Sequence, residues 1–153
     1  MAQLTIRGQK AIENLRKQLI QETNKDLEGY FLDIADDAID WSPVWSGSYV
    51  RSFSFKADNS RSRGRRIDGA NWRFPNKTGS EADRESGRDA LKSDIKSIFL
   101  DKSKLPESKS YTLRNDANHA GFVENGVEGG AHPPGPKPIN GYKIFAKLKR
   151  LYG

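Results

Sequence analysis

Apolar residues recur every three or four positions along the start of the chain. They fall at Ile12, Leu15, Leu19, Leu27, Phe31, Ile34, Ala38 and Trp41. This spacing predicts that they share one side of an α-helix that runs from about Arg7 to Trp41 and is roughly 50 Å long. We expect a bend at Gly29, and we expect the helix to end before Pro43, because a proline disfavours helix in the residue that precedes it.

After this helix the pattern changes to a period of two. Tyr49, Arg51, Phe53 and Phe55 alternate with the residues between them as far as Lys56. This alternation predicts a strand with its aromatic side chains on one face, and we expect two of the three to lie in the core. Because Arg51 shares that face, we do not expect the face to be fully buried at that end.

The second half of the chain contains shorter periodic segments. Apolar residues every three or four positions predict a helix over about 88–100, and alternation predicts a strand over 110–114. A short helix is expected over 117–124. Asn140 is expected to cap a last short helix, with Ile144 and Leu148 on its apolar side.

Two segments are nearly empty of apolar residues. The first, 57–87, is rich in Ser, Gly and Asn, contains the cluster Arg61, Arg63, Arg65 and Arg66, and has Ile67, Trp72 and Phe74 as its large apolar residues. We predict a long basic loop there, which is functional or ordered by a partner. The second, 126–140, is rich in Gly and Pro and predicts an extended arm, which leads into a C-terminal tail with five basic residues and no acidic one from Lys137 onward.

Composition sets limits on the fold and on the chemistry. The 153 residues predict one domain, 1–153, and a hydrophobic fraction of 35% predicts a lean core. The predicted class is α+β, with the long helix and a second helix packed against a small, mainly antiparallel sheet. The chain has no cysteine, which excludes disulfides and thiolate chemistry. We recognise neither a signal peptide nor a membrane span in the sequence, and the net charge of +6 favours nucleic acid or acidic protein as a partner.

Residues that could carry catalysis are few. His119 and His132 do not have the spacing of a zinc site, and His119 near Asp116 and Glu124 could act as a general base. A histidine at the surface or in an interface is the interpretation we favour. We therefore expect no catalytic residue, no metal and no cofactor.

Acidic residues cluster near the end of the long helix. Asp36 and Asp40 lie one turn apart, beside Asp33 and Asp37. Paired carboxylates can hold a divalent metal, so a metal-dependent nuclease is a distant alternative. We favour a solvated helix face.

The arginine cluster at 61–66 raises a nearer alternative. Arginine suits phosphate groups, and Trp72 and Phe74 could stack on bases. The chain matches no zinc-finger or RNA-recognition signature. A small basic DNA-binding protein therefore stays open as the alternative function.

Two motifs resemble one protein family. Residues 42–53, Ser-Pro-Val-Trp-Ser-Gly-Ser-Tyr-Val-Arg-Ser-Phe, resemble the first signature of the bacteriophage neck or tail-completion family, which follows a long helix. Residues 112–126, Thr-Leu-Arg-Asn-Asp-Ala-Asn-His-Ala-Gly-Phe-Val-Glu-Asn-Gly, resemble its second signature. The order of the elements around the motifs also agrees, from about residue 10 to 150.

This resemblance implies a structural virion protein and not an enzyme. The family's members are small α+β proteins that form rings at the junction of head and tail. For this chain it implies a ring of six or twelve subunits, assembled in the cytoplasm of a bacterial host. The implied partners are portal, adaptor or stopper proteins on one side and tail-terminator, tube or sheath proteins on the other, with contact to packaged DNA open and no membrane partner.

The resemblance also suggests roles for individual residues. Gly47 is expected to supply a turn with positive φ, with Pro43 and Gly126 as further turn residues. Glu124 and Gly126 are expected to shape a subunit or sheet-edge contact, and Arg51 is expected to lie at a subunit interface. Glu124 could pair there with Arg51 or Arg114. The expected interaction loop contains Arg61, Arg63, Arg65, Arg66, Trp72 and Phe74, and the basic tail with Lys147 and Arg150 is expected to dock on an adjacent ring.

Overall fold

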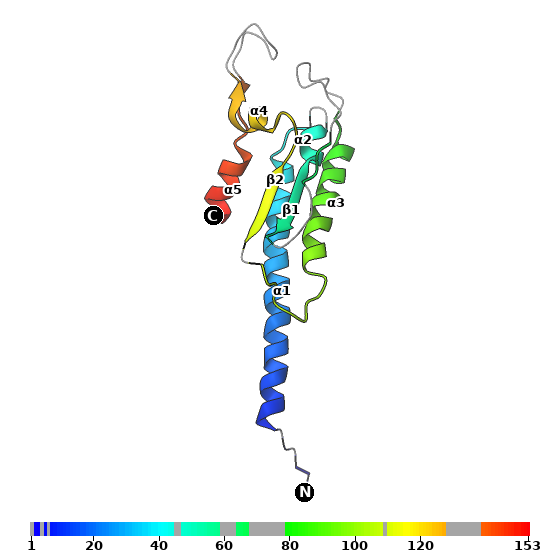
Figure 1. Cartoon of the computed structure of the whole chain (residues 1–153), viewed down its shortest axis with the longest axis vertical. Coiled ribbons are helices and arrows are strands. Elements are labelled where there is room, and N and C mark those ends of the chain that lie inside the picture. The colour runs from blue at the N-terminus through cyan, green and yellow to red at the C-terminus, as the bar shows by residue number, and fades with distance from the viewer. Residues whose placement is uncertain are drawn as a thin grey trace.

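The fold is α+β, as predicted. The computed structural model describes residues 2–3, 5, 7–44, 47–58, 64–67, 79–108, 110–127 and 139–153. In chain order the elements are α1 (Gly8–Asp40), α2 (Ser48–Arg51), β1 (Phe53–Ala57), α3 (Glu81–Ile98), β2 (Tyr111–Asn115), α4 (Ala120–Asn125), β3 (Gly126–Val127), β4 (Ile139–Asn140) and α5 (Ile144–Tyr152). Figure 1 shows a body built around one end of α1, from which the other end of that helix projects.

Helix α1 confirms the predicted long helix to within a residue at each end. It is continuous over 33 residues, including Gly29, so the expected bend is wrong. Its second half lies in the body, whereas residues 8–23, which we call the stalk, extend beyond it (Figure 1). The boundary is Asn24, which is buried and donates hydrogen bonds to the carbonyl oxygens of Lys102 at 3.0 Å and Lys104 at 2.8 Å.

The body has two layers. Helices α1 and α3 form one layer, and the antiparallel pair β1–β2 packs against them with Phe53 opposite Asn115 and Ala57 opposite Tyr111. Phe31 of α1 joins the layers, because its ring centroid lies 4.9 Å from that of Phe55 and 4.7 Å from that of Tyr111. The largest fully buried apolar side chains are Phe53, Phe99, Ile39, Leu91, Ile95, Ile144 and Val50.

The strand predicted from Tyr49 is only half correct. Residues 48–51 form the helical turn α2, and the strand begins at Phe53. Tyr49 and Val50 are both buried, which a strand exposed on one side would not allow, and the Ser52 hydroxyl donates to the Ser48 carbonyl oxygen at 2.7 Å. Tyr49, Phe53 and Phe55 are all core residues, one more than expected.

Helix α3 begins seven residues earlier than predicted, at Glu81. Ser80 and Asp83 form a capping box, in which the Asp83 carboxylate accepts from the Ser80 backbone amide at 2.9 Å. The predicted basic loop at 57–87 is therefore shorter at its C-terminal end. Gly87 then lets α3 approach α2, because a Cβ there would collide with the Val50 carbonyl oxygen.

The C-terminal region forms a small unit on the side of α1. Helix α4 begins at Ala120, later than the predicted 117, and β3 pairs with β4 so that Gly126 lies opposite Asn140. Asn140 is therefore a strand residue and does not cap α5, whose preceding residue is Lys143 at φ 51°. The Tyr152 hydroxyl donates to Asp37 at 2.6 Å and holds α5 on α1. The predicted Pro-rich arm falls largely on 128–138, outside the described residues.

Candidate assembly interface

The two family-like motifs, far apart in sequence, meet in the body. The Asn115 side-chain amide donates to the Tyr49 carbonyl oxygen at 2.8 Å, and the Asp116 backbone amide donates to the Ser52 carbonyl oxygen at 3.3 Å. Asn115 also accepts from the Ala117 amide at 3.0 Å, which turns the chain out of β2. The described parts of the two motifs thus contact each other through Tyr49, Ser52, Asn115 and Asp116.

Gly47 forms the turn that precedes α2. Its φ of 75° lies in the left-handed region, which confirms the predicted positive-φ turn. A Cβ at this buried position would lie 2.6 Å from Cγ of Asp83, so both the backbone and the space require glycine. Pro43 is buried between the end of α1 and this turn, and Gly126 at φ 79° closes α4.

Glu124 has a different role from the one we expected. Its carboxylate accepts from the backbone amides of Ile144 at 2.8 Å and Ala146 at 3.2 Å, so it caps the N-terminus of α5. Arg51 instead lies 3.6 Å from Asp83, and Arg114 pairs with Asp116. Within one chain, therefore, Glu124 pairs with neither arginine.

His119 lies beside the buried Tyr49, with ring centroids 6.2 Å apart. Burial lowers the pKa of His119, and burial together with the charge of Glu124 raises the pKa of Tyr49. Both groups are therefore neutral near pH 7. The two acids that could have oriented His119 as a general base bind Arg114 and the amides of α5. His132 lies outside the described residues.

The acidic cluster of α1 is part of a clamp to α3. Arg88 binds Asp36 at 2.6 Å and Asp40 at 2.5 Å, and Lys92 binds Asp36 at 2.9 Å. Burial opposes ionisation of Asp36, but the hydrogen bonds from Lys92 and Arg88 outweigh it, so the pKa of this carboxyl is lowered. Within the described part of the chain, no three His, Asp or Glu side chains group closely enough to hold a metal ion.

The arginine cluster is only partly described. Arg65 connects β1 to α3, because it donates to the Phe53 carbonyl oxygen at 2.6 Å and pairs with Asp94 at 2.8 Å. Arg66 is exposed. The remaining members of the predicted interaction loop, Arg61, Arg63, Trp72 and Phe74, lie outside the described residues.

The basic tail forms the outer side of α5. The Lys147 ammonium lies 5.8 Å from the ring centroid of Trp41, a cation–π contact between α5 and α1. Lys143, Lys147, Lys149 and Arg150 are all exposed. The docking of Lys147 and Arg150 on an adjacent ring stays a prediction.

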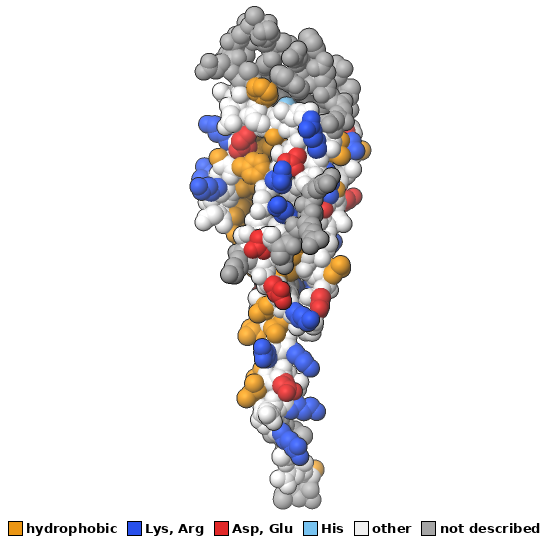
Figure 2. All heavy atoms as spheres, viewed as in Figure 1, with side chains coloured by type: hydrophobic (Ala, Val, Ile, Leu, Met, Phe, Trp, Pro, Cys, Tyr) orange, Lys and Arg blue, Asp and Glu red, His pale blue; other side chains and the backbone are white. Residues whose placement is uncertain are grey.

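The sequence did not reveal that the first apolar residues of α1 are uncovered. Ile12, Leu15 and Leu19 are 67%, 66% and 64% exposed, and Figure 2 shows hydrophobic side chains along one side of the stalk. The step of eight residues from Leu19 to Leu27 rotates the position by roughly 80° around a helix. Ile12, Leu15 and Leu19 therefore lie on a different face of the helix from the apolar residues that begin at Leu27. This change of face was the sign in the sequence that the first three would not join the core.

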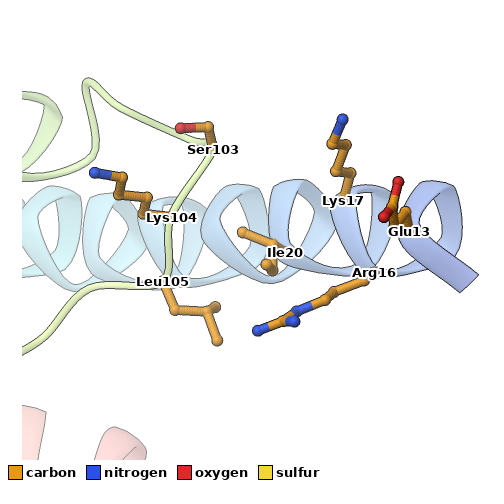
Figure 3. Close-up of a pocket in the computed structure, with 7 residues that line it drawn as sticks. All are labelled: Glu13, Arg16, Lys17, Ile20, Ser103, Lys104 and Leu105. Atoms are coloured by element: carbon orange, nitrogen blue, oxygen red, sulfur yellow. The ribbon is translucent and has the colours of Figure 1, made fainter.

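A hollow of about 480 Å³ adjoins the stalk where it leaves the body. Figure 3 shows that Ile20 and Leu105 supply apolar surface, and that Arg16 and Leu105 extend on the same side of the helix. Three basic residues, Arg16, Lys17 and Lys104, and one acidic residue, Glu13, also line it. The hollow therefore combines apolar surface with charged side chains of both signs.

No family model matches this chain, and neither a curated protein nor a solved structure is significantly similar to it. Across the described ranges, no helix is both long and apolar enough to cross a membrane.

Proposed function

We propose that this protein is a structural virion subunit of a tailed bacteriophage, which forms a ring at the head–tail junction and joins the portal side to the tail. The observation that carries the proposal is the stalk. It projects from the body and exposes Ile12, Leu15 and Leu19 on one side. A surface of this kind is typical of a chain that is completed by a partner.

The free energy available from this surface is considerable. Covering each of the three side chains yields roughly 1–2 kcal/mol, given that each is about two-thirds exposed. The contribution repeats at every subunit of a closed ring. The low hydrophobic fraction of the whole sequence, 35%, is compatible with this, because neighbours in a ring bury part of each subunit.

The contact between the two family-like motifs supports the same class of protein. The two segments that resemble the neck or tail-completion signatures contact one another through Asn115 and Tyr49, around the turn at Gly47. We propose the portal, adaptor or stopper proteins as partners on one side of the ring. On the other side we propose the tail-terminator, tube or sheath proteins.

The experiment is to remove the gene from the phage that encodes it and to image the particles by electron microscopy. We expect filled heads and separate tails, with joining restored by the purified protein, and density for a ring of this chain at the junction of intact virions. Normal virions without the chain would contradict the proposal. A steep, salt-dependent shift of any DNA duplex by the purified protein, without a ring, would favour the DNA-binding alternative.

A further inference from the structure

The outward side of α5 carries a compact set of positive charges. Lys147 and Arg150 are three residues apart, so they lie on the same side of the helix. Lys143 stands one turn before Lys147 and accepts from its backbone amide at 2.9 Å. Together with Lys149 these residues form an exposed basic surface on α5, and Figure 2 shows basic side chains at the edge of the body where α5 lies in Figure 1.

The fold does not neutralise this basic surface. Among the described residues, none of the four cations takes part in an ion pair, and the contact of Lys147 is with the uncharged ring of Trp41. The acids that contact α5 bind other groups of it. Glu124 accepts from its N-terminal amides, and Asp37 accepts from the Tyr152 hydroxyl. The four positive charges are therefore left for a partner outside the chain.

Lys143 has a backbone conformation that does not favour lysine. Its φ of 51° lies in the left-handed region, and within the described part of the chain it is the one residue other than glycine with positive φ. Glycine adopts this conformation without the steric cost that a Cβ brings. The turn into α5 would thus form more easily with glycine, so a lysine here points to a role for its ammonium group.

The composition of the surface favours one kind of partner. Protein–protein interfaces are depleted of lysine and enriched in aromatic residues, whereas the exposed residues of α5 include three basic residues and no aromatic one. A helix that binds a membrane surface inserts its apolar side chains into lipid, but Ile144 and Leu148 are buried in the body. Phosphate groups of a nucleic acid need only the cations.

We propose that the basic surface formed by Lys143, Lys147, Lys149 and Arg150 binds the phosphate backbone of duplex DNA without reading its sequence. From Lys143 to Arg150 the chain advances by about 10 Å, a length over which one DNA strand presents about three phosphates. Lysine ammonium groups on flexible stems suit such contacts, because they act as point charges and require no fixed geometry. The inference goes beyond the proposed function, and it gives the tail a partner other than an adjacent ring.

The first test measures how the affinity of the full chain for a labelled DNA duplex depends on salt. Lys147→Gln/Arg150→Gln should lower the affinity at about 0.1 M salt at least about tenfold and reduce the slope of log affinity against log salt by about 1.8, because each phosphate contact contributes about 0.9. The control is Lys10→Gln/Lys17→Gln, which removes the same charge from exposed positions on the stalk and should keep the wild-type slope. Equal slopes for the two variants would overturn the proposal.

The second test uses the backbone of Lys143 to separate binding from folding. Lys143→Gly should leave the midpoint of urea denaturation unchanged or raise it, because glycine adopts positive φ freely, and should reduce the salt slope by about 0.9. A lower midpoint with an unchanged slope would show that this lysine serves the fold and contradict its part in the surface.

The third test excludes other sources of binding. If Arg61→Gln/Arg63→Gln abolishes DNA binding while Lys147→Gln/Arg150→Gln binds as the wild type does, the site is the arginine cluster and the proposal is wrong. It is also wrong if the wild-type chain binds duplex RNA, poly-glutamate or anionic vesicles more tightly than duplex DNA.

These outcomes separate DNA binding from the function in the virion. DNA binding that depends on α5, by a chain that is absent from virions, would support the DNA contact and contradict the phage proposal. A ring of this chain in virions, with no binding of duplex DNA by the purified chain, would support the phage proposal and contradict the DNA contact.

Discussion

The two halves of α1 have similar apolar spacing and opposite surroundings. In the body, Ala35, Ala38 and Ile39 are almost completely buried, whereas Ile12, Leu15 and Leu19 in the stalk are exposed. The difference arises from the elements around them, because α3, α5 and the β1–β2 pair all pack on the second half. Apolar periodicity thus defines a helix, but the rest of the chain decides which part of it becomes core.

This contrast also separates stability from assembly. A helix as short as the stalk is marginal in water by itself, and it persists here as the continuation of a packed helix. We therefore expect changes in the body to alter folding, and changes in the stalk to alter association with little effect on folding.

The largest effect is expected at the turn in the body. Gly47→Val forces a β-branched residue to adopt φ 75° and places its side chain against Asp83. We expect a loss of at least about 3 kcal/mol in the free energy of unfolding, enough to abolish soluble folding. Circular dichroism during urea denaturation would measure it. The control is Gly29→Ala, which should raise the stability of the single chain by up to about 1 kcal/mol, and an unchanged midpoint for Gly47→Val would show that the turn does not need glycine.

A direct comparison of the two regions uses the same substitution in each. Leu91→Ala opens a cavity in the core and should lower the free energy of unfolding by about 2–5 kcal/mol. Leu15→Ala should change it by less than about 0.5 kcal/mol in the monomer, because that side chain is already exposed. Denaturation at low protein concentration measures both, and similar losses at the two sites would refute the division into body and stalk.

A smaller effect is expected where α5 joins the body. Glu124→Gln removes the charge that accepts the amides of Ile144 and Ala146, and we expect a loss of about 1 kcal/mol. Hydrogen exchange should accelerate in α5 and not in α3. Glu107→Gln, at an exposed acid, is the control. Unchanged exchange in α5 would mean that its other contacts suffice to hold it.

The smallest effect is a pH dependence at the clamp between α1 and α3. The pKa of Asp36 is lowered in the folded protein, so its contribution to stability is complete above the usual carboxyl pKa of about 4 and is lost as the pH falls below it. Asp36→Asn should therefore flatten the fall of the unfolding free energy between about pH 6 and about pH 2. The stalk acid Glu13, changed to Gln, should leave that profile unaltered.

Local rules predicted much of the fold. The periodicity from Ile12 to Trp41 is long enough to define α1 within one residue at each end, and the alternation after Ser110 located β2. Gly47 was predicted to have positive φ because few other residues tolerate a tight turn between two elements. These features depend on residues close together in sequence.

The errors have physical causes. Four residues, Ser48–Arg51, are too few to distinguish a period of two from a helical turn, so α2 was mistaken for strand. The start of α3 was visible in the capping pair Ser80 and Asp83, which is only one of several polar pairs in a segment poor in apolar residues. The cap of α5 could not be seen, because Glu124 comes from a segment twenty residues away. Of the two exposed surfaces that the structure describes, the basic side chains of the tail were among the residues singled out from the sequence, whereas the apolar side of the stalk was not.

The loop after α3, which contains Lys102 and Lys104, is attached to α1 at Asn24, where the stalk begins. This attachment determines how a force on the stalk reaches the body. Asn24 is tied to two carbonyl oxygens, and the Lys102 ammonium pairs with Glu28 one turn further on. A sideways force on the tip of the helix therefore also acts on this loop, which holds the helix where it enters the body. The loop follows directly after the buried Phe99. Motion of a neighbour bound at the tip would therefore reach the aromatic core by two routes, along α1 to Phe31 and through this loop to Phe99.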